Sequence, residues 1–170
     1  LTASATCSCR SKTSTAAFFA TRIEIHNMIS HKHLMIRAEV QNPIKTTESA
    51  FTWMEKLVDS IGMVICPNGG PHVHYVNKEN NCGIAAVVMI ETSHCSLHVW
   101  DKADPPLVQF DVYSCSDYEV SKVLELLNEM KPTKVWWKLF NRESIIKEED
   151  NSFKDYAITL KSDDCLRELF

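Results

Sequence analysis

The chain has 170 residues, 45% of them hydrophobic, which is enough for one compact domain and too little for two ordinary ones. Its formal net charge of −4 excludes a broad basic field, so neither nucleic acid nor an anionic membrane surface is expected as the main partner. No apolar run approaches the roughly 18 residues that a membrane-spanning helix needs. The seven cysteines include no C-x-x-C pair, which fits neither a disulfide framework nor a common zinc module. We therefore expect a cytoplasmic, reducing location.

Residues 1–27 are predicted to lie outside the folded domain, as a disordered or targeting-like extension. Residues 1–23 contain no acidic residue and are rich in Ser, Thr and Ala. This composition resembles an organellar transit peptide, and the alternative is translated upstream sequence. We favour the second interpretation because Met28 directly precedes the first patterned segment.

The first strand and the first helix are predicted between residues 33 and 61. Apolar and polar residues alternate over 33–40, which indicates a strand with one buried face. A helix over 47–61 follows, with Thr47 as its N-cap and Gly62 at its end. Its apolar stripe has helical spacing and consists of Ala50, Met54, Leu57, Val58 and Ile61.

Short apolar runs separated by turn-forming residues predict an antiparallel sheet in the middle of the chain. The runs are residues 63–66, 73–76, 84–90, 95–100 and 107–113. A capping box at residues 116–119 predicts the start of a second helix, whose apolar stripe extends to Met130. A last strand is expected over residues 135–140.

This order of elements predicts an α+β fold in which both helices cover one face of an antiparallel sheet. The other face then needs a cover. A second sheet from an identical chain supplies it most simply, which gives an α/β/β/α sandwich in a homodimer or a larger homo-oligomer. The domain is expected over residues 28–143. Residues 144–170 are polar, with only a weak apolar pattern, and we expect a C-terminal tail.

The most reactive side chains directly follow the most hydrophobic predicted strand. The segment 91–100 reads Glu-Thr-Ser-His-Cys-Ser-Leu-His-Val-Trp. Burying Ser, His and Cys is costly unless they are hydrogen-bonded or serve a function. Because Cys115 ends the following strand, an antiparallel return would bring it back towards Ser93. Alternate residues of a strand share a face, which groups four side chains: His94, Ser96, His98 and Trp100.

This pattern resembles the bacterial type of S-adenosylmethionine decarboxylase. That family carries G-x-S-G-hydrophobic-S-E-S-H-x-x-I-H-T-W-P-E, followed by a strand that ends in Asp-x-Phe-Thr-Cys. The corresponding residues here are 83–100, with Ser-His at 93–94 and His-Val-Trp at 98–100, and Asp-Val-Tyr-Ser-Cys at 111–115. Lys-His-Leu at 32–34 is similar to the Arg-His-Leu of the family's opening strand.

The resemblance implies a proenzyme that cleaves itself between Thr92 and Ser93. The Ser93 hydroxyl attacks the preceding carbonyl and forms an ester. His98 then removes the Ser93 α-proton, and the Thr92 carboxylate leaves by β-elimination. The dehydroalanine that remains hydrolyses to a pyruvoyl group, so the cofactor is derived from Ser93 itself.

The implied reaction is decarboxylation of S-adenosylmethionine for spermidine biosynthesis. The pyruvoyl ketone forms a Schiff base with the amine of the substrate and accepts the electrons released as carbon dioxide leaves. By resemblance, Cys115 donates the proton that replaces the carboxylate. Trp100 and His94 are expected to line the substrate site.

Four differences from the family pattern bear on this prediction. Ala85 stands where the family has a serine that helps to hold the ester, and Thr92 replaces a glutamate. Residues 101–102 are Asp-Lys in place of Pro-Glu, and the Lys102 ammonium cannot accept hydrogen bonds from ribose hydroxyls. Two extra residues lie between His98 and Cys115. Lys102 favours an alternative, a pyruvoyl-dependent ornithine or arginine decarboxylase, and Ala85 favours an uncleaved, non-catalytic homologue that binds a ligand or an active partner.

Structural roles compete with these assignments. Cys115 is equally compatible with a small buried hydrophobe, and His94 with a partner for a backbone carbonyl. His72 and His74 share a strand face, so zinc could bind there with His94, His98 or Cys95. No carboxylate or second clustered pair completes a tetrahedral set, so no metal is expected. The Trp136–Trp137 pair beside lysines is better explained by strand packing than by nucleic-acid binding.

Overall fold

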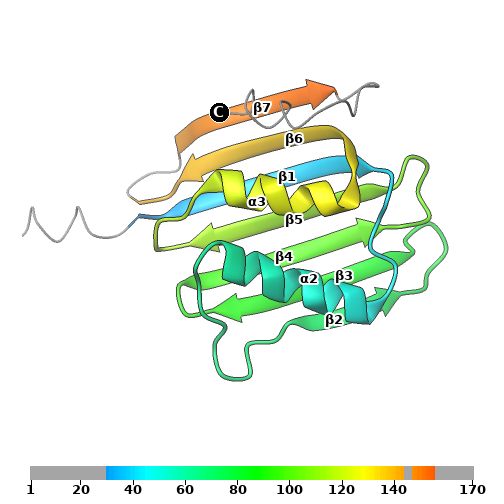
Figure 1. The fold of residues 1–170 in the computed structure, drawn as a ribbon, viewed down its shortest axis with the longest axis horizontal. Coiled ribbons are helices and arrows are strands. Elements are labelled where there is room, and N and C mark those ends of the chain that lie inside the picture. The colour runs from blue at the N-terminus through cyan, green and yellow to red at the C-terminus, as the bar shows by residue number, and fades with distance from the viewer. Residues whose placement is uncertain (1–29, 144–146, 156–170) are drawn as a thin grey trace, which may run out of the picture.

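The computed structural model describes residues 30–143 and 147–155, which form a seven-stranded antiparallel sheet with two helices against it (Figure 1). The strand order is β2-β3-β4-β5-β1-β6-β7. The strands are β1 (Lys32–Val40), β2 (His72–Val76), β3 (Gly83–Ile90), β4 (Ser93–Trp100), β5 (Leu107–Ser114), β6 (Pro132–Asn141) and β7 (Lys147–Asp155). The helices are α2 (Thr47–Ser60) and α3 (Val120–Leu127), and the 3₁₀ turn η2 (Asn128–Met130) continues α3.

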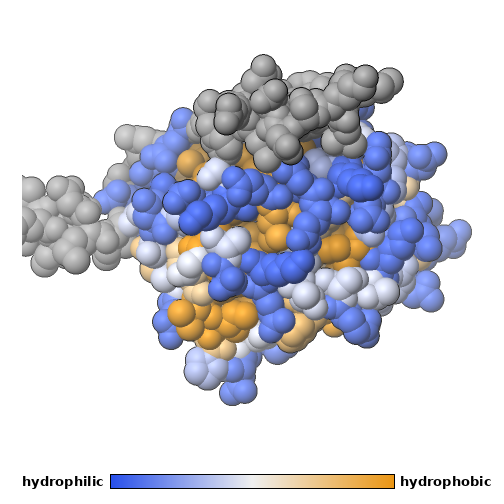
Figure 2. All heavy atoms as spheres, in the orientation of Figure 1, coloured by the Kyte–Doolittle hydropathy of each residue, from blue (hydrophilic) through white to orange (hydrophobic). Residues whose placement is uncertain are grey.

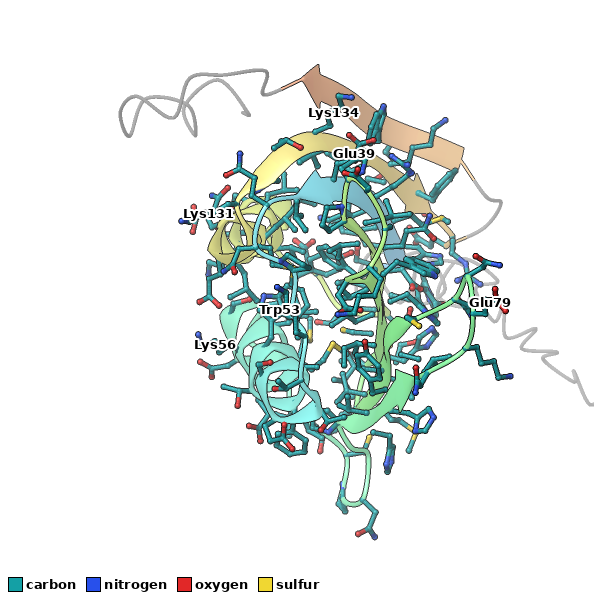
Figure 3. All side chains as sticks on the ribbon, turned by 90° about the vertical axis from the view of Figure 1, so that its right-hand side faces the viewer. Glu39, Trp53, Lys56, Glu79, Lys131 and Lys134 are labelled. Carbon is teal, nitrogen blue, oxygen red and sulfur yellow. The ribbon has the colours of Figure 1, made fainter. Side chains whose placement is uncertain are left out.

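Both helices lie on the same face of the sheet, as Figure 3 shows edge-on. The hydrophobic core fills the space between them and the sheet. Period-two alternation decides which strand residues enter this core, because successive side chains point to opposite faces. In β1, for example, the buried residues are Leu34, Ile36, Ala38 and Val40. The predicted α+β class with two helices on one face is confirmed.

Helix α2 begins as its apolar pattern predicts, but its N-cap is Thr46 and the prediction of Thr47 was wrong. Thr46 has the extended backbone of a cap residue, and its Oγ1 accepts a hydrogen bond from the Ser49 N–H at 3.2 Å. Thr47 is already helical. All five residues of the predicted stripe are buried, together with Trp53, which packs edge-on against Phe110.

Helix α3 begins at Val120 and lacks the predicted capping box. Glu119 is the N-cap, and its side chain makes no capping bond. The predicted cap, Ser116, instead donates its backbone N–H to the Ser114 hydroxyl at 2.9 Å, because the chain is still leaving β5 at this point. The predicted strand over residues 63–66 is likewise wrong. This segment is a loop with a single bridge, between Ile65 and Ile90.

The C-terminal part of the described chain adds a strand to the sheet. Strand β7 pairs antiparallel with β6, so part of the segment 144–170 that we expected as a tail belongs to the sheet. Residues 1–27, expected as an extension, lie outside the described residues. No helix of the described residues is long and apolar enough to cross a membrane.

The second face of the sheet, which we call the open face, has no helix over it in the described residues. Its side chains include three exposed apolar residues, Met35, Val87 and Met89, of which Met89 is 52% exposed. The helix side, shown in Figure 2, carries mainly hydrophilic residues, with apolar side chains visible between the helices. The open face is therefore the one that needs a partner, and the dimeric sandwich stays a prediction.

Candidate active site

The peptide bond between Thr92 and Ser93 lies in the tight turn that joins β3 to β4. Ser93 has a φ angle of +151°, a region that residues with a side chain rarely adopt. Backbone strain of this kind costs roughly 1–3 kcal/mol and tends to collect at functional sites. The turn therefore holds its serine in an unfavourable backbone conformation.

Cys115 lies beside this turn because β4 and β5 are paired antiparallel. Ser93 stands directly opposite Ser114, and the next residue, Cys115, donates its backbone N–H to the Thr92 carbonyl oxygen at 2.9 Å. The Cys115 side chain is exposed. The structure thus brings together three residues that the sequence singled out, Thr92, Ser93 and Cys115.

The loop after α2 supports the turn from the other side. The Thr92 hydroxyl donates to the sulfur of Met63 at 3.1 Å. The backbone of the loop also bonds to the turn, since the Glu91 N–H donates to the Val64 carbonyl at 2.9 Å. The sequence reasoning missed this support, because it assigned the loop to a strand.

The His94 side chain lies within hydrogen-bond reach of the Ser93 hydroxyl. Its Nδ1 is 3.2 Å from Ser93 Oγ. The imidazole packs against the ring of Tyr113 in a T-shaped arrangement, with 5.7 Å between ring centroids. Sequence reasoning assigned His94 only a lining role, whereas the structure puts it in contact with the serine.

Next to this turn, five side chains on the open face form what we call the Asp111 cluster: His33, Ser96, Asp111, Tyr113 and Arg142. The Asp111 carboxylate accepts hydrogen bonds from the Ser96 hydroxyl and from His33 Nε2. Arg142 lies 3.3 Å from His33 Nδ1, and its guanidinium stacks over the Tyr113 ring at 4.2 Å. The pairing of β1 with β5 brings these side chains together, and no local sequence pattern predicts the cluster.

His98 lies on the open face but away from Ser93. It stands opposite Ala85 in β3 and Gln109 in β5, and its ring stacks on Trp100 with 5.7 Å between centroids. Five residues of strand separate it from Ser93, which is about 16 Å at the usual rise per residue. Within one chain, the structure does not bring His98 to the serine.

The family model of S-adenosylmethionine decarboxylase matches residues 32–143, which contain both helices and strands β1 to β6. The chain belongs to the S-adenosylmethionine decarboxylase family. It is also similar to the crystal structure of the adenosylmethionine decarboxylase from Aquifex aeolicus VF5, with a TM-score of 0.51 and 21% sequence identity over 74% of this chain and 98% of that chain. This likeness shows the fold. No curated protein matches the chain.

A groove of about 570 Å³ crosses the open face of this decarboxylase domain. It runs over β1, β4, β5 and β6, and its walls include His98, Asp111 and Trp136. The Arg37 guanidinium stacks over the Trp136 ring, with Cζ 4.6 Å from the ring centroid. The neighbouring Trp137 is buried in the core. The two tryptophans therefore face opposite sides of the sheet and form no common platform.

The two positions that differ most from the family pattern lie at the far end of β4. Asp101 is buried and accepts hydrogen bonds from the Tyr75 hydroxyl at 3.2 and 3.3 Å, which ties the edge strand β2 to the end of β4. Lys102 is exposed, with its ammonium 3.6 Å from the Asp101 carboxylate. Asp101 therefore has a structural partner, and Lys102 presents a positive charge at the end of the strand.

Cys95 is separated from the histidines of β2 by the sheet itself. It is fully buried on the helix face, and burial raises the pKa of its thiol to about 12. His72 and His74 pair with Val87 and Ala85 and so lie on the open face. In the part of the chain that the structure describes, no three His, Cys, Asp or Glu residues are grouped as metal ligands.

Acid is expected to destabilise the fold through Asp111. Burial alone raises the pKa of this carboxyl, but hydrogen bonds from His33 and Ser96, with the charges of His33 and His94, outweigh it and lower the pKa. A lowered folded-state pKa stabilises the fold above the unfolded-state pKa of about 3.9, and this contribution disappears as the pH falls through the folded-state value. Urea unfolding from pH 6 down to about pH 3 should therefore show a steeper loss of stability in the wild type than in Asp111→Asn.

The matched control for this measurement is Asp104→Asn, which changes an exposed carboxyl in the loop between β4 and β5. We expect its acid profile to follow the wild type. Equal slopes for the wild type and Asp111→Asn would show that the cluster contributes nothing to acid sensitivity.

Proposed function

We propose that this chain is a pyruvoyl-dependent S-adenosylmethionine decarboxylase that cleaves itself between Thr92 and Ser93. The placement of the Thr92 carbonyl supports this most directly. Its oxygen accepts the Cys115 N–H, and a donor aimed at this oxygen stabilises the negative charge that forms when a nucleophile attacks the carbonyl carbon. The strained φ angle of Ser93 favours breaking the same bond, because the strain is released when the chain is cut.

In self-cleavage, an ester bond first replaces the peptide bond between Thr92 and Ser93, and the ester is then broken. Ser93 Oγ attacks the Thr92 carbonyl carbon, the C–N bond breaks, and an ester joins the two residues. A base then takes the α-proton of Ser93, and the Thr92 carboxylate leaves with the electrons of the ester bond. The two products are residues up to Thr92 and residues from 93 onward.

The base for the second step comes, in our proposal, from a second copy of the chain. His98 lies about 16 Å along the strand from its own Ser93, too far for proton transfer. The exposed Met35, Val87 and Met89 favour packing of the two open faces against each other in a homodimer. In such an α/β/β/α sandwich, His98 of each copy can serve the Ser93 of the other, and the Trp100 ring stacked on it lines the same site.

The decarboxylation then uses the groups beside position 93. A pyruvoyl group there supplies a ketone that condenses with the substrate amine and takes up the electrons of the departing carboxylate. The Cys115 thiol, exposed and next to the turn, donates the proton to the α-carbon of the substrate. The product, decarboxylated S-adenosylmethionine, serves as the aminopropyl donor for spermidine.

A second candidate substrate rests on Lys102. Its exposed ammonium stands where the family pattern has a ribose-binding acid, so decarboxylation of ornithine or arginine on the same scaffold is the alternative. Release of carbon dioxide from each of the three substrates separates these activities. Ala85 lies opposite His98 and has no hydroxyl to hold the ester. This residue favours the other alternative, an uncleaved homologue that binds a ligand or an active partner.

Intact-mass analysis of the purified protein tests the proposal. We expect two fragments that meet between residues 92 and 93, with a pyruvoyl group at the start of the second. Borohydride reduction in the presence of S-adenosylmethionine should add mass to that second fragment alone. A single full-length mass and no trapped adduct would rule out the enzyme.

A further inference from the structure

The contact between Ser93 and His94 is not explained by packing alone. The Ser93 hydroxyl and His94 Nδ1 are 3.2 Å apart, within reach of a hydrogen bond. With the ring proton on Nε2, Nδ1 accepts the serine proton. The hydroxyl that must lose a proton to attack the Thr92 carbonyl therefore already faces a base of its own chain.

The surroundings of His94 hold the ring in this position. The imidazole lies against Tyr113, and Tyr113 is itself covered by the guanidinium of Arg142. The packing of Tyr113 and Arg142 therefore keeps the His94 ring beside the serine hydroxyl.

We propose that His94 is the general base for the first step of self-cleavage, the formation of the ester, and this rests on the proposed function. His94 Nδ1 takes the proton from Ser93 Oγ as the new C–O bond forms. The same proton then passes to the Ser93 nitrogen as the C–N bond breaks, so that His94 ends the step neutral. His98 of a second copy removes the α-proton in the next step.

In this proposal, ester formation uses residues of one chain, whereas the elimination step uses residues of two chains. Ala85 cannot help to hold the ester, since it has no hydroxyl. His94 contacts the Ser93 hydroxyl, and the Cys115 N–H contacts the Thr92 carbonyl oxygen, so both lie at the reacting atoms of the turn.

The experiment separates the two steps with hydroxylamine, which cuts esters at neutral pH. A His98→Ala chain lacks the base for elimination, so the ester accumulates, and hydroxylamine should split the chain between Thr92 and Ser93. A His94→Ala, His98→Ala chain should be split at least about 100-fold more slowly, because the ester forms without its base. Fragment masses distinguish this cut from one at the Asn68–Gly69 bond.

The control is His74→Ala, His98→Ala, which removes an exposed histidine of the same face and should split at the rate of His98→Ala. Equal rates for the His94 double variant and His98→Ala would overturn the proposal. If His98→Ala itself is never split, then ester formation, and with it the proposed function, fails instead.

A loss of folding is separated from a loss of the base by chemical rescue. Added imidazole can enter the space left by His94→Ala and should raise the splitting rate of the His94 double variant by about tenfold or more. A purely structural role for His94 predicts no effect of imidazole. That result would also overturn the proposal.

Discussion

A Ser93→Ala chain is expected to stay whole after purification and to have no measurable decarboxylase activity. Alanine has no hydroxyl to attack the Thr92 carbonyl, so the ester cannot form at that bond. Without the ester, no pyruvoyl group forms, and the chain has no electron sink for a departing carboxylate. Denaturing electrophoresis and carbon dioxide release measure the two losses.

Two further variants sharpen this prediction. Ser121→Ala changes a serine of α3 on the opposite face and should be cleaved like the wild type. Ser93→Cys keeps a nucleophile at the turn and should be cleaved in part. If Ser93→Ala were still cut between residues 92 and 93, the serine would not be the attacking group, and the proposed mechanism would be wrong.

Two inactive variants should restore activity when they share a dimer. His98→Ala lacks the base that serves the other copy, while Cys115→Ala lacks the proton donor of its own Ser93. In a mixed dimer, the His98→Ala chain supplies Ser93 and Cys115, and the Cys115→Ala chain supplies His98. One of the two sites is then complete, so the purified mixed dimer should have about half of the wild-type activity.

Co-expression with two different affinity tags, followed by purification on both, isolates the mixed dimer for this assay. Each variant alone, carried through the same purification, should stay at least about 100-fold below the wild type. A mixed dimer without activity would show that His98 and Ser93 act within one chain. That result would contradict the packing of the two open faces.

Much of the fold follows from local periodicity. The alternation in β1 and the stripe of α2 each assign residues to the buried side without knowledge of any partner element. The prediction failed for two different reasons. Ser116 forms a local hydrogen bond to Ser114 at the end of β5 in place of a helix cap. The loop at residues 63–66 forms nonlocal backbone bonds to β3 and the turn after it, and so it is not a strand of its own.

The candidate site was predictable where it depends on one hairpin. The order of β4 and β5 places Cys115 near Ser93 in any antiparallel return, and the structure has this arrangement. His33 and Arg142 could not be found in this way. They reach Asp111 and Tyr113 only because β1 lies between β5 and β6, a strand order that no segment encodes by itself.

Sequence alone predicted the fold class and the face of each central strand on which a side chain lies, and it singled out the residues that we propose to carry the chemistry. These depend on side-chain period and on neighbours in the chain. The contact of His94 with the serine hydroxyl depends on the conformation of the turn, and the contact of His33 with Asp111 depends on the strand order, so both became known only from the folded chain. A pattern of alternation assigns a side chain to a face, but its distance from another residue depends on register, turn geometry and strand order.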